Sequence, residues 1–429
     1  MAKPTIVLLT IGGNELPCLV AARRLWELFS EVDGVPPVFW PIHSSETTSQ
    51  SQRVRNALKD KIGAIPENNW NPISVLPHDP RDIYAKVQHR IEKSAGKVRR
   101  YHLHYTGATS AMGIHSFEAM AGRPDKEIPY ETSYLDSRTH RLVSGGWGTE
   151  ISRLLPKDDE RATWQLSLEK LVTLHGGRLN PPEKWKGLEG LVEAFDAALV
   201  VPVGDETSAR ANRESALMLV VSEFNEWADH QLRQPEVDPA RLKGLLKAFD
   251  AAFEVDIAAA KAVLDSDQRA RVAFEKWVGH KLRLALEEFG EPIPEVVTGQ
   301  HPCPDGGRSN FQLDVATVLG YQLVLISVTT SPDSGRTKQK AMEAYYHARQ
   351  IGGDEAYSGT VGWLNEFNAS SVESGLRIDL PRRANVEAGL HIDVSQRAPV
   401  GLWNMSDLPH LQSKFSDILK NDLKWRSHE

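Results

Sequence analysis

The chain has 429 residues, which at about 150 residues per domain predicts roughly three domains. Its 50 Lys and Arg residues against 57 Asp and Glu residues give a net charge of −7. This balance excludes a protein that coats nucleic acid through bulk positive charge, although a local basic cleft is still allowed. No stretch reaches the ~20 apolar residues needed to cross a bilayer, so we expect no membrane span.

The chain contains two cysteines, Cys18 and Cys303, which lie far apart in the sequence. Neither has a cluster of Cys or His residues near it, which argues against a disulfide framework and against a structural zinc site. We therefore expect a protein of the reducing cytoplasm.

The first 154 residues alternate short apolar runs with helical stretches. We expect strands at 6–11, 38–42, 73–76 and 101–105, and helices at 16–29, 48–62, 83–94 and 110–121. Strands that recur with helices of 10 to 15 residues between them predict a parallel, Rossmann-like α/β sheet. Such sheets bind ligands at the carboxyl ends of their strands.

The rest of the chain divides into a helical middle section, 155–264, and a third unit, 265–429. In the middle section apolar residues fall at helical spacing, and two similar stretches within it are too few for a solenoid. In the third unit a helix precedes a Gly- and Pro-rich loop, the two strands of FQLDVATVLGYQLVLISVTT, and a second helix at 336–350. The order helix, hairpin, helix predicts a separate α/β domain, which the C-terminal tail completes.

Small and polar residues follow two strands of the first unit. Gly12, Gly13 and Asn14 follow the first strand, and the sequence YTGATS, residues 105–110, links the fourth strand to a helix. Glycines let a ligand approach the backbone, and hydroxyls and free N–H groups at a helix start suit phosphate. Neither segment fits the P-loop or dinucleotide pattern, which argues against ATP and NAD. Each segment alone is also what a tight turn between strand and helix requires.

Three segments together, GGNELP at 12–17, HSSET at 43–47 and YTGATSAM at 105–112, resemble the CARF domain of type III CRISPR accessory proteins. The resemblance implies a Rossmann-like fold, a homodimer, and a dimer cleft that binds cyclic tetra-adenylate or cyclic hexa-adenylate as activator. The residues that it implies as ligand-binding are Gly12, Gly13, Asn14, Ser45, Thr47, Thr106, Gly107, Ala108, Thr109, Ser110 and Met112.

The chain departs from the related CARF sequences at two of these positions. Ser110 stands where they have a lysine, and Ala108 stands where they have a second glycine. Loss of the lysine removes a cation from the site of a ligand with four phosphates. Either backbone amides carry more of the binding here, or another base such as Arg138 compensates.

The third unit resembles the PD-(D/E)xK nucleases, which have a restriction-endonuclease-like fold. The resemblance implies that Asp314, on the first hairpin strand, holds Mg²⁺ or Mn²⁺ and that Glu275, on the preceding helix, is a second ligand. Hard divalent cations take oxygen ligands, and the metal activates the attacking water. Asp is disfavoured within a strand, which favours a functional role for Asp314 over a structural one.

The nuclease pattern is incomplete in this chain. Ser327-Val328-Thr329 stands where the family has Glu-x-Lys, and Gly279 stands where its Trp-Leu-Glu motif has the glutamate. Glu275, one turn earlier on the same helix face, is the candidate replacement for that glutamate. Lys338 and Lys340, at the start of the next helix, are candidate replacements for the catalytic lysine. Each of these three side chains could equally belong to a solvated helix face.

The resemblances imply a cyclic oligoadenylate-activated, metal-dependent nuclease of type III CRISPR antiviral defence, which cuts DNA, RNA or both. Arg349 and Gln350 are candidate contacts to the nucleic-acid phosphates, or they only orient the hairpin. The alternative is a CARF sensor or scaffold with an inactive nuclease-like domain, with or without cleavage of its own ring. A small-molecule α/β enzyme is the least favoured class, because His102 and His104 have no acidic partner at ligand spacing.

Overall fold

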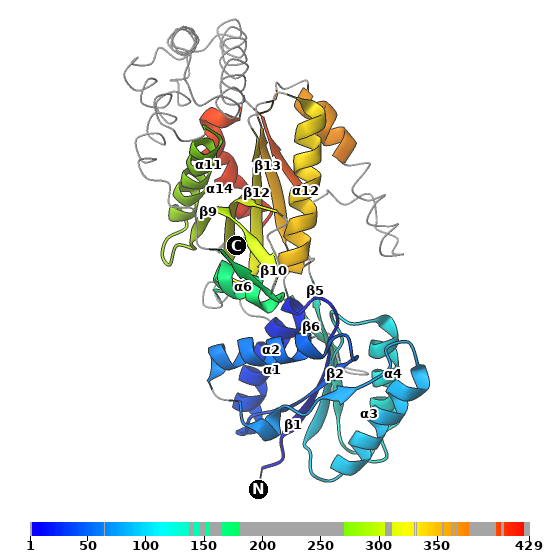
Figure 1. The fold of residues 1–429 in the computed structure, drawn as a ribbon. Helices are drawn as coiled ribbons and strands as arrows, with labels where there is room; N and C mark the ends of the chain where they lie inside the picture. Colours follow the sequence, from blue (N-terminus) through cyan, green and yellow to red (C-terminus); the bar gives the residue numbers. More distant parts are fainter. Residues whose placement is uncertain are drawn as a thin grey trace, which may run out of the picture. The chain divides into compact units, whose positions relative to one another are not determined.

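The computed structural model of the chain forms two compact units (Figure 1). It describes residues 2–63, 65–136, 141–145, 152–154, 165–180, 270–304, 311–329, 331, 333–353, 356–362, 364, 368–376, 400–404 and 407–423. The first unit is residues 1–178 with 304–307 and 351–355, and the second is 179–303 with 308–350 and 356–429. Residues 181–264, which make up most of the helical section expected at 155–264, lie outside the described residues. The three-domain division therefore stays a prediction.

The first unit is built on a seven-stranded sheet in the order β3-β2-β1-β4-β5-β6-β7. Its strands are β1 (Thr5–Thr10), β2 (Val38–His43), β3 (Ile73–Ser74), β4 (Arg100–His104), β5 (Tyr130–Asp136), β6 (Arg141–Gly145) and β7 (Ser152–Leu154). The pairs from β3 to β5 are parallel, and β6 and β7 are antiparallel. The mixed α/β fold with a parallel sheet is thus confirmed. The strand order reverses between β1 and β4, where such sheets form their ligand crevice.

Four helices cover the two faces of this sheet (Figure 1). They are α1 (Leu16–Asp33), α2 (Thr48–Ile62), α3 (Pro80–Ser94) and α4 (Ser110–Ala121). Helices α1 and α2 lie on one face, and α3 and α4 on the other. Ile83, Val87 and Ile91 recur at helical spacing on α3 and pack with Leu8 and Leu103 of the strands in one buried core. Shorter elements of the unit are η1 (Glu67–Asn69) and α6 (Leu168–Leu174), and β8 (Gly177–Leu179) lies where the chain passes from the first unit to the second.

The second unit contains a five-stranded sheet in the order β14-β13-β12-β11-β9. Its strands are β9 (Val296–Gln300), β11 (Leu313–Leu319), β12 (Gln322–Thr329), β13 (Tyr357–Gly362) and β14 (Val400–Trp403), and β10 (Pro302–Pro304) lies outside this sheet. Strand β11 is antiparallel to β9 and β12, whereas β12, β13 and β14 are parallel. Helices α11 (Ala270–Glu287) and α14 (Leu411–Asn421) cover one face and α12 (Ser334–Gly352) the other, with η3 (Leu408–His410) before α14 (Figure 1).

The hairpin of β11 and β12 forms the centre of this sheet. Leu319 pairs with Gln322, so the turn has two residues, and Gly320 takes the positive φ of +66° that such a turn requires. Every residue of both strands is buried, because helices cover both faces. On α11, a Cβ at Gly279 would lie 2.7 Å from Cγ2 of Thr298. The helix therefore packs so closely on β9 that a glutamate at Gly279 would not fit.

Among the described residues, no helix is both long and apolar enough to cross a membrane.

Candidate functional sites

The loops that follow β1 and β4 touch one another at two glycines. A Cβ on Gly12 would lie 1.6 Å from the carbonyl oxygen of Gly107, so no other residue fits there. Gly107 has a φ of +93°, and a Cβ on it would lie 3.1 Å from the backbone oxygen of Asn14. The two expected ligand loops thus form one surface at the switch point of the sheet. We call this surface, with the β2–α2 loop beside it, the carboxyl edge.

Three expected ligand residues of the carboxyl edge use their hydroxyls to hold the loops in place. Thr47 Oγ1 donates to the Ile11 carbonyl over 3.3 Å, which ties the β2–α2 loop to the end of β1. Thr106 Oγ1 accepts a 2.7 Å hydrogen bond from the Leu135 amide. Thr109 Oγ1 caps α4 by accepting from the Met112 amide over 3.3 Å. These threonines position the edge.

Other expected ligand residues present open surface. Gly13, Ser45 and Ser110 are exposed, and a Cβ on Gly13 would meet nothing within 4 Å. Ser110 is the first residue of α4, where helix N–H groups lack intrahelical partners and favour anions.

Three of the expected ligand residues have mainly structural places, and the candidate base Arg138 lies outside the described part of the chain. Asn14 Oδ1 accepts from the Leu16 amide over 3.2 Å at the start of α1. Half-buried Ala108 packs against the core under α4. Met112 is 2% exposed within that core, so it has no surface to offer a ligand and we leave it out of the site. Arg138 lies outside the described residues.

An ion-paired cluster lies behind the β1–α1 loop. Glu15 is buried, and its carboxylate contacts the guanidinium of Arg53 and, over 3.2 Å, Nδ1 of His175. Arg53 Nε also donates to the Leu174 carbonyl over 2.9 Å. The cluster fastens α6 and the loop to each other. The partners are 38 and more residues apart in sequence, so spacing gave no signal for them.

The buried histidines of β4 form a network that resembles a hydrolase triad in its order of groups. His102 Nε2 lies 2.7 Å from Ser133 Oγ, and His102 Nδ1 lies 3.7 Å from a carboxylate oxygen of Glu131. His104 Nδ1 lies 3.1 Å from the same hydroxyl. Sequence spacing offered no acidic partner for these histidines, and the structure supplies Glu131 from the neighbouring strand β5.

This network is nevertheless structural. Ser133 is 1% exposed and both histidines are fully buried, so no substrate reaches the hydroxyl. Burial lowers the pKa of His102, and it lowers the pKa of His104 to about 3. Both rings are therefore neutral near pH 7 and serve as hydrogen-bonding groups of the core.

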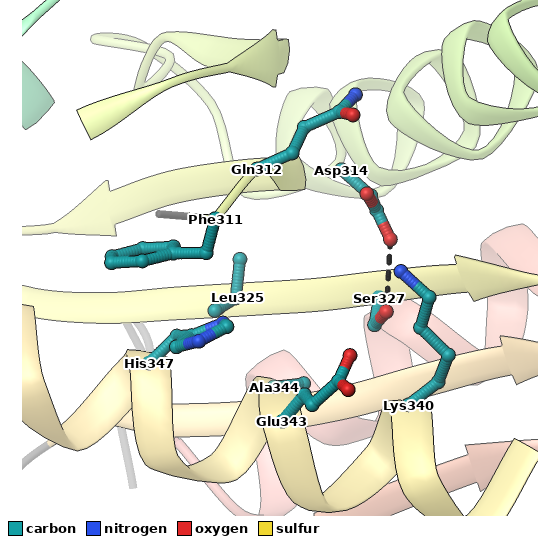
Figure 2. A pocket seen from close by; sticks show the side chains of 9 residues that line it. All are labelled: Phe311, Gln312, Asp314, Leu325, Ser327, Lys340, Glu343, Ala344 and His347. Atoms are coloured by element: carbon teal, nitrogen blue, oxygen red, sulfur yellow. Dashed lines mark hydrogen bonds between the residues drawn. The ribbon is translucent and has the colours of Figure 1, made fainter. Parts of the chain in front are cut away.

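A cavity of about 270 Å³ lies beside the hairpin of the second unit, between β11, β12 and α12 (Figure 2). It is lined by Phe311, Gln312, Asp314, Leu325, Ser327, Lys340, Glu343, Ala344 and His347. The buried carboxylate of Asp314 accepts hydrogen bonds of 2.8 Å from Ser327 Oγ and from the Val328 amide, both on Oδ2. Burial raises the pKa of Asp314, and the positive charge of Lys340 opposes that shift.

The structure separates the expected catalytic residues. Lys340 lines the cavity with its Nζ near Asp314 (Figure 2). Lys338 does not line it: a Cβ on Gly375 would lie 2.7 Å from Lys338 Nζ, so this lysine lies against the segment 368–376. Glu275 is buried and accepts from Gln312 Nε2 over 3.3 Å, but it is not part of the cavity wall. Thus Asp314 and Lys340 share the cavity, and the expected metal pair of Asp314 and Glu275 does not.

Arg349, a candidate phosphate contact, interacts with its own helix. Its guanidinium contacts the Tyr345 hydroxyl and lies 5.1 Å from the centre of that ring. Gln350 beside it is exposed.

Two residues of the cavity wall, Glu343 and His347, were missed by the sequence analysis. They follow Lys340 by three and seven residues, so the three share one face of α12. That spacing was the signal in the sequence from which Glu343 and His347 could have been predicted. The His347 ring stacks on Phe311 with 3.9 Å between ring centres, and burial lowers the pKa of His347.

The cavity lacks the set of ligands that the resemblance implied for Mg²⁺ or Mn²⁺. Ser327, at the strand position of the family's glutamate, donates a hydrogen bond to Asp314 where a metal site needs a second carboxylate. Within the described residues, no group of three or more His, Cys, Asp and Glu side chains is arranged to hold a metal ion. The donor set at this position therefore differs from the one expected.

Comparison with known proteins identifies the overall fold. No protein-family profile matches the chain, and no curated protein matches its sequence. Protein VC1899 from Vibrio cholerae is 13% identical, with 97% of this chain and 98% of that chain covered and a TM-score of 0.61. Can2 from Sulfobacillus thermosulfidooxidans, solved in complex with cyclic tetra-adenylate, is 14% identical, with 97% of each chain covered and a TM-score of 0.56. At these identities the likeness establishes a shared fold.

Proposed function

We propose that the chain is a receptor for cyclic oligoadenylate in type III CRISPR antiviral defence and that it binds the ring at the carboxyl edge. The observation that carries the proposal is the contact of Gly12 with Gly107, which joins two loops into one surface with Gly13 and Ser110 exposed on it. Helix N–H groups and hydroxyls at such a surface suit the phosphates of the ring. Can2, which has the same overall fold, was solved with cyclic tetra-adenylate bound.

The receptor is proposed to act as a homodimer. A cyclic oligoadenylate with an even number of nucleotides can be divided by a two-fold axis, so two copies of the carboxyl edge can bind it in equivalent ways. This predicts one ring per two chains.

The second unit has two candidate roles. A metal-dependent endonuclease for DNA or RNA is favoured by Asp314, a buried carboxylate within a strand and next to the ammonium of Lys340. A scaffold without nuclease activity is favoured by Ser327, which takes the place of a carboxylate, and by Glu275, which is outside the cavity. We favour the scaffold, because a divalent ion needs several anionic oxygens directed at one point.

Cleavage assays decide between these two roles. Plasmid DNA and single-stranded RNA are incubated with the chain and Mg²⁺ or Mn²⁺, with and without each ring, and the ring itself is checked for linear products. The scaffold role predicts intact nucleic acid in every reaction. Ring-dependent cleavage that Asp314→Asn abolishes would establish the nuclease instead.

Changing Ser110 to lysine tests the position of the ring on the carboxyl edge. We expect Ser110→Lys to lower the Kd for cyclic tetra-adenylate about tenfold, because the exposed side chain would place a cation near the phosphates. The gain should shrink as salt rises. Calorimetry of both proteins at two salt concentrations measures it. Ser413→Lys, an exposed change on α14, controls for net charge, and an equal gain in this control would contradict the assignment.

A further inference from the structure

We propose that the ammonium of Lys340 takes the place of the divalent cation in the cavity of the second unit, so that this cavity is a metal-independent site. The inference concerns the second unit alone and does not depend on ring binding at the carboxyl edge. It rests on the charges that line the cavity, on the hydrogen bonds of Asp314, and on the element that supplies Lys340.

Charged side chains of both signs line the cavity. Two carboxylates, Asp314 and Glu343, line the cavity together with the cation of Lys340. His347, stacked on Phe311, is neutral near pH 7 because burial lowers its pKa. Asp314 is 5% exposed, and a buried carboxylate is costly unless a positive charge and hydrogen bonds compensate it. Lys340 supplies that charge to the cavity wall.

The carboxylate of Asp314 is held by two hydrogen bonds. Its Oδ2 accepts from both the Ser327 hydroxyl and the Val328 amide at 2.8 Å. These two bonds stabilise the negative charge on one oxygen of the buried carboxylate. Lys340 lines the same cavity and points toward Asp314 (Figure 2), and its positive charge acts on that carboxylate.

The cation of the cavity comes from α12 and not from the strand β12. In this chain β12 carries Ser327 and Thr329, which are uncharged, where a metal site would need charged side chains. Lys340 reaches the cavity from α12 on the opposite wall, and Lys338 on the same helix is directed at Gly375 instead. The positive charge of the cavity is therefore supplied by a side chain of the protein, Lys340 of α12.

Removal of the ammonium should convert the cavity into a metal site. Lys340→Met keeps an unbranched side chain of similar length but removes the cation from the cavity that Asp314 and Glu343 line. Their oxygens and the neutral ring of His347 are suitable ligands for Mn²⁺. Lys338→Met is the matched control, because it removes the same charge from the same helix outside the cavity.

The test titrates the full chain with Mn²⁺ and follows the paramagnetic resonance signal of the free ion and the thermal unfolding midpoint. For each protein, Mn²⁺ binding at the cavity is taken as the binding that is lost when Asp314→Asn is added. Wild type and Lys338→Met should show none, whereas Lys340→Met should bind about one ion per chain and unfold at a higher temperature with Mn²⁺ than without. Addition of Asp314→Asn to Lys340→Met should abolish that gain.

Two results would overturn the proposal. The first is Mn²⁺ binding to the wild type that Asp314→Asn abolishes, since the cavity would then hold a metal beside Lys340. The second is a folded Lys340→Met chain that gains no binding. Should this variant fail to fold, Lys340→Gln replaces it with the same criteria, and the wild-type titration stands on its own. The titration contains no ring, so its outcome is separate from that of ring binding.

Discussion

Gly12→Ala should greatly weaken binding of cyclic oligoadenylate and destabilise the first unit, whereas Gly13→Ala should leave the stability of the unit unchanged. At Gly12 the added methyl carbon would lie 1.6 Å from the carbonyl oxygen of Gly107, so the two loops must separate. At Gly13 nothing lies within 4 Å of the added carbon. Separated loops no longer form a single surface for a ring.

We expect Gly12→Ala to cost about 3 kcal/mol of stability, the upper part of the usual range for forced overpacking, and to weaken ring binding by more than about 100-fold, which is about 2.7 kcal/mol. Calorimetry with cyclic tetra-adenylate and thermal unfolding of both variants measure the two effects. A Gly12→Ala chain that binds the ring as tightly as the wild type would show that the contact of the loops is irrelevant to binding.

The first unit should lose stability steeply in acid because of its buried histidines. The pKa of His104 is about 3 in the folded chain, that of His102 is also lowered by burial, and both are near 6.5 in an unfolded chain. Above pH 6.5 both states hold neutral rings, and the stability is fully present. Below it the unfolded chain takes up protons that the folded chain refuses, so His104 alone costs about 2 kcal/mol between pH 6.5 and 5.

Hydrogen exchange of the β1 and β4 amides, followed by mass spectrometry at pH 7 and pH 5, reports this loss for the first unit alone. After correction for the intrinsic exchange rate, protection should fall by at least about 30-fold, which is the 2 kcal/mol above. His104→Gln keeps a hydrogen-bonding group beside Ser133 but does not titrate. The loss of protection between pH 7 and pH 5 should therefore be smaller in this variant. Equal protection of the wild-type chain at both pH values would refute the role of these histidines.

The sequence predicted the first unit well because each of its signals is local. Apolar runs with intervening helical spacing gave β1, β2, β4 and the helices between them, and the bounds of α2 and α4 agree with the structure. Strands β5, β6 and β7 were not predicted individually. They contain polar residues such as Ser133, whose burial depends on the pairing of β5 with β4 and not on the pattern of β5 itself.

The candidate sites were predicted less completely, because they depend on contacts between distant segments. Asp314 was identified through the resemblance to PD-(D/E)xK nucleases, which its position within an apolar strand supported. The difference between Lys338 and Lys340 lies in which side of α12 meets the sheet, and a motif comparison ignores this. Glu343 was missed because the resemblance directed attention to β12, where Ser327 stands in place of a carboxylate.

Titration of cyclic tetra-adenylate and cyclic hexa-adenylate into the wild-type chain, followed by calorimetry, is the decisive test of ring binding at the carboxyl edge. The account predicts saturable binding of one of the two rings at one ring per two chains, with a Kd that rises at least about 100-fold in Gly12→Ala and falls about tenfold in Ser110→Lys. No binding of either ring to the folded chain, or binding that both substitutions leave unchanged, would contradict it.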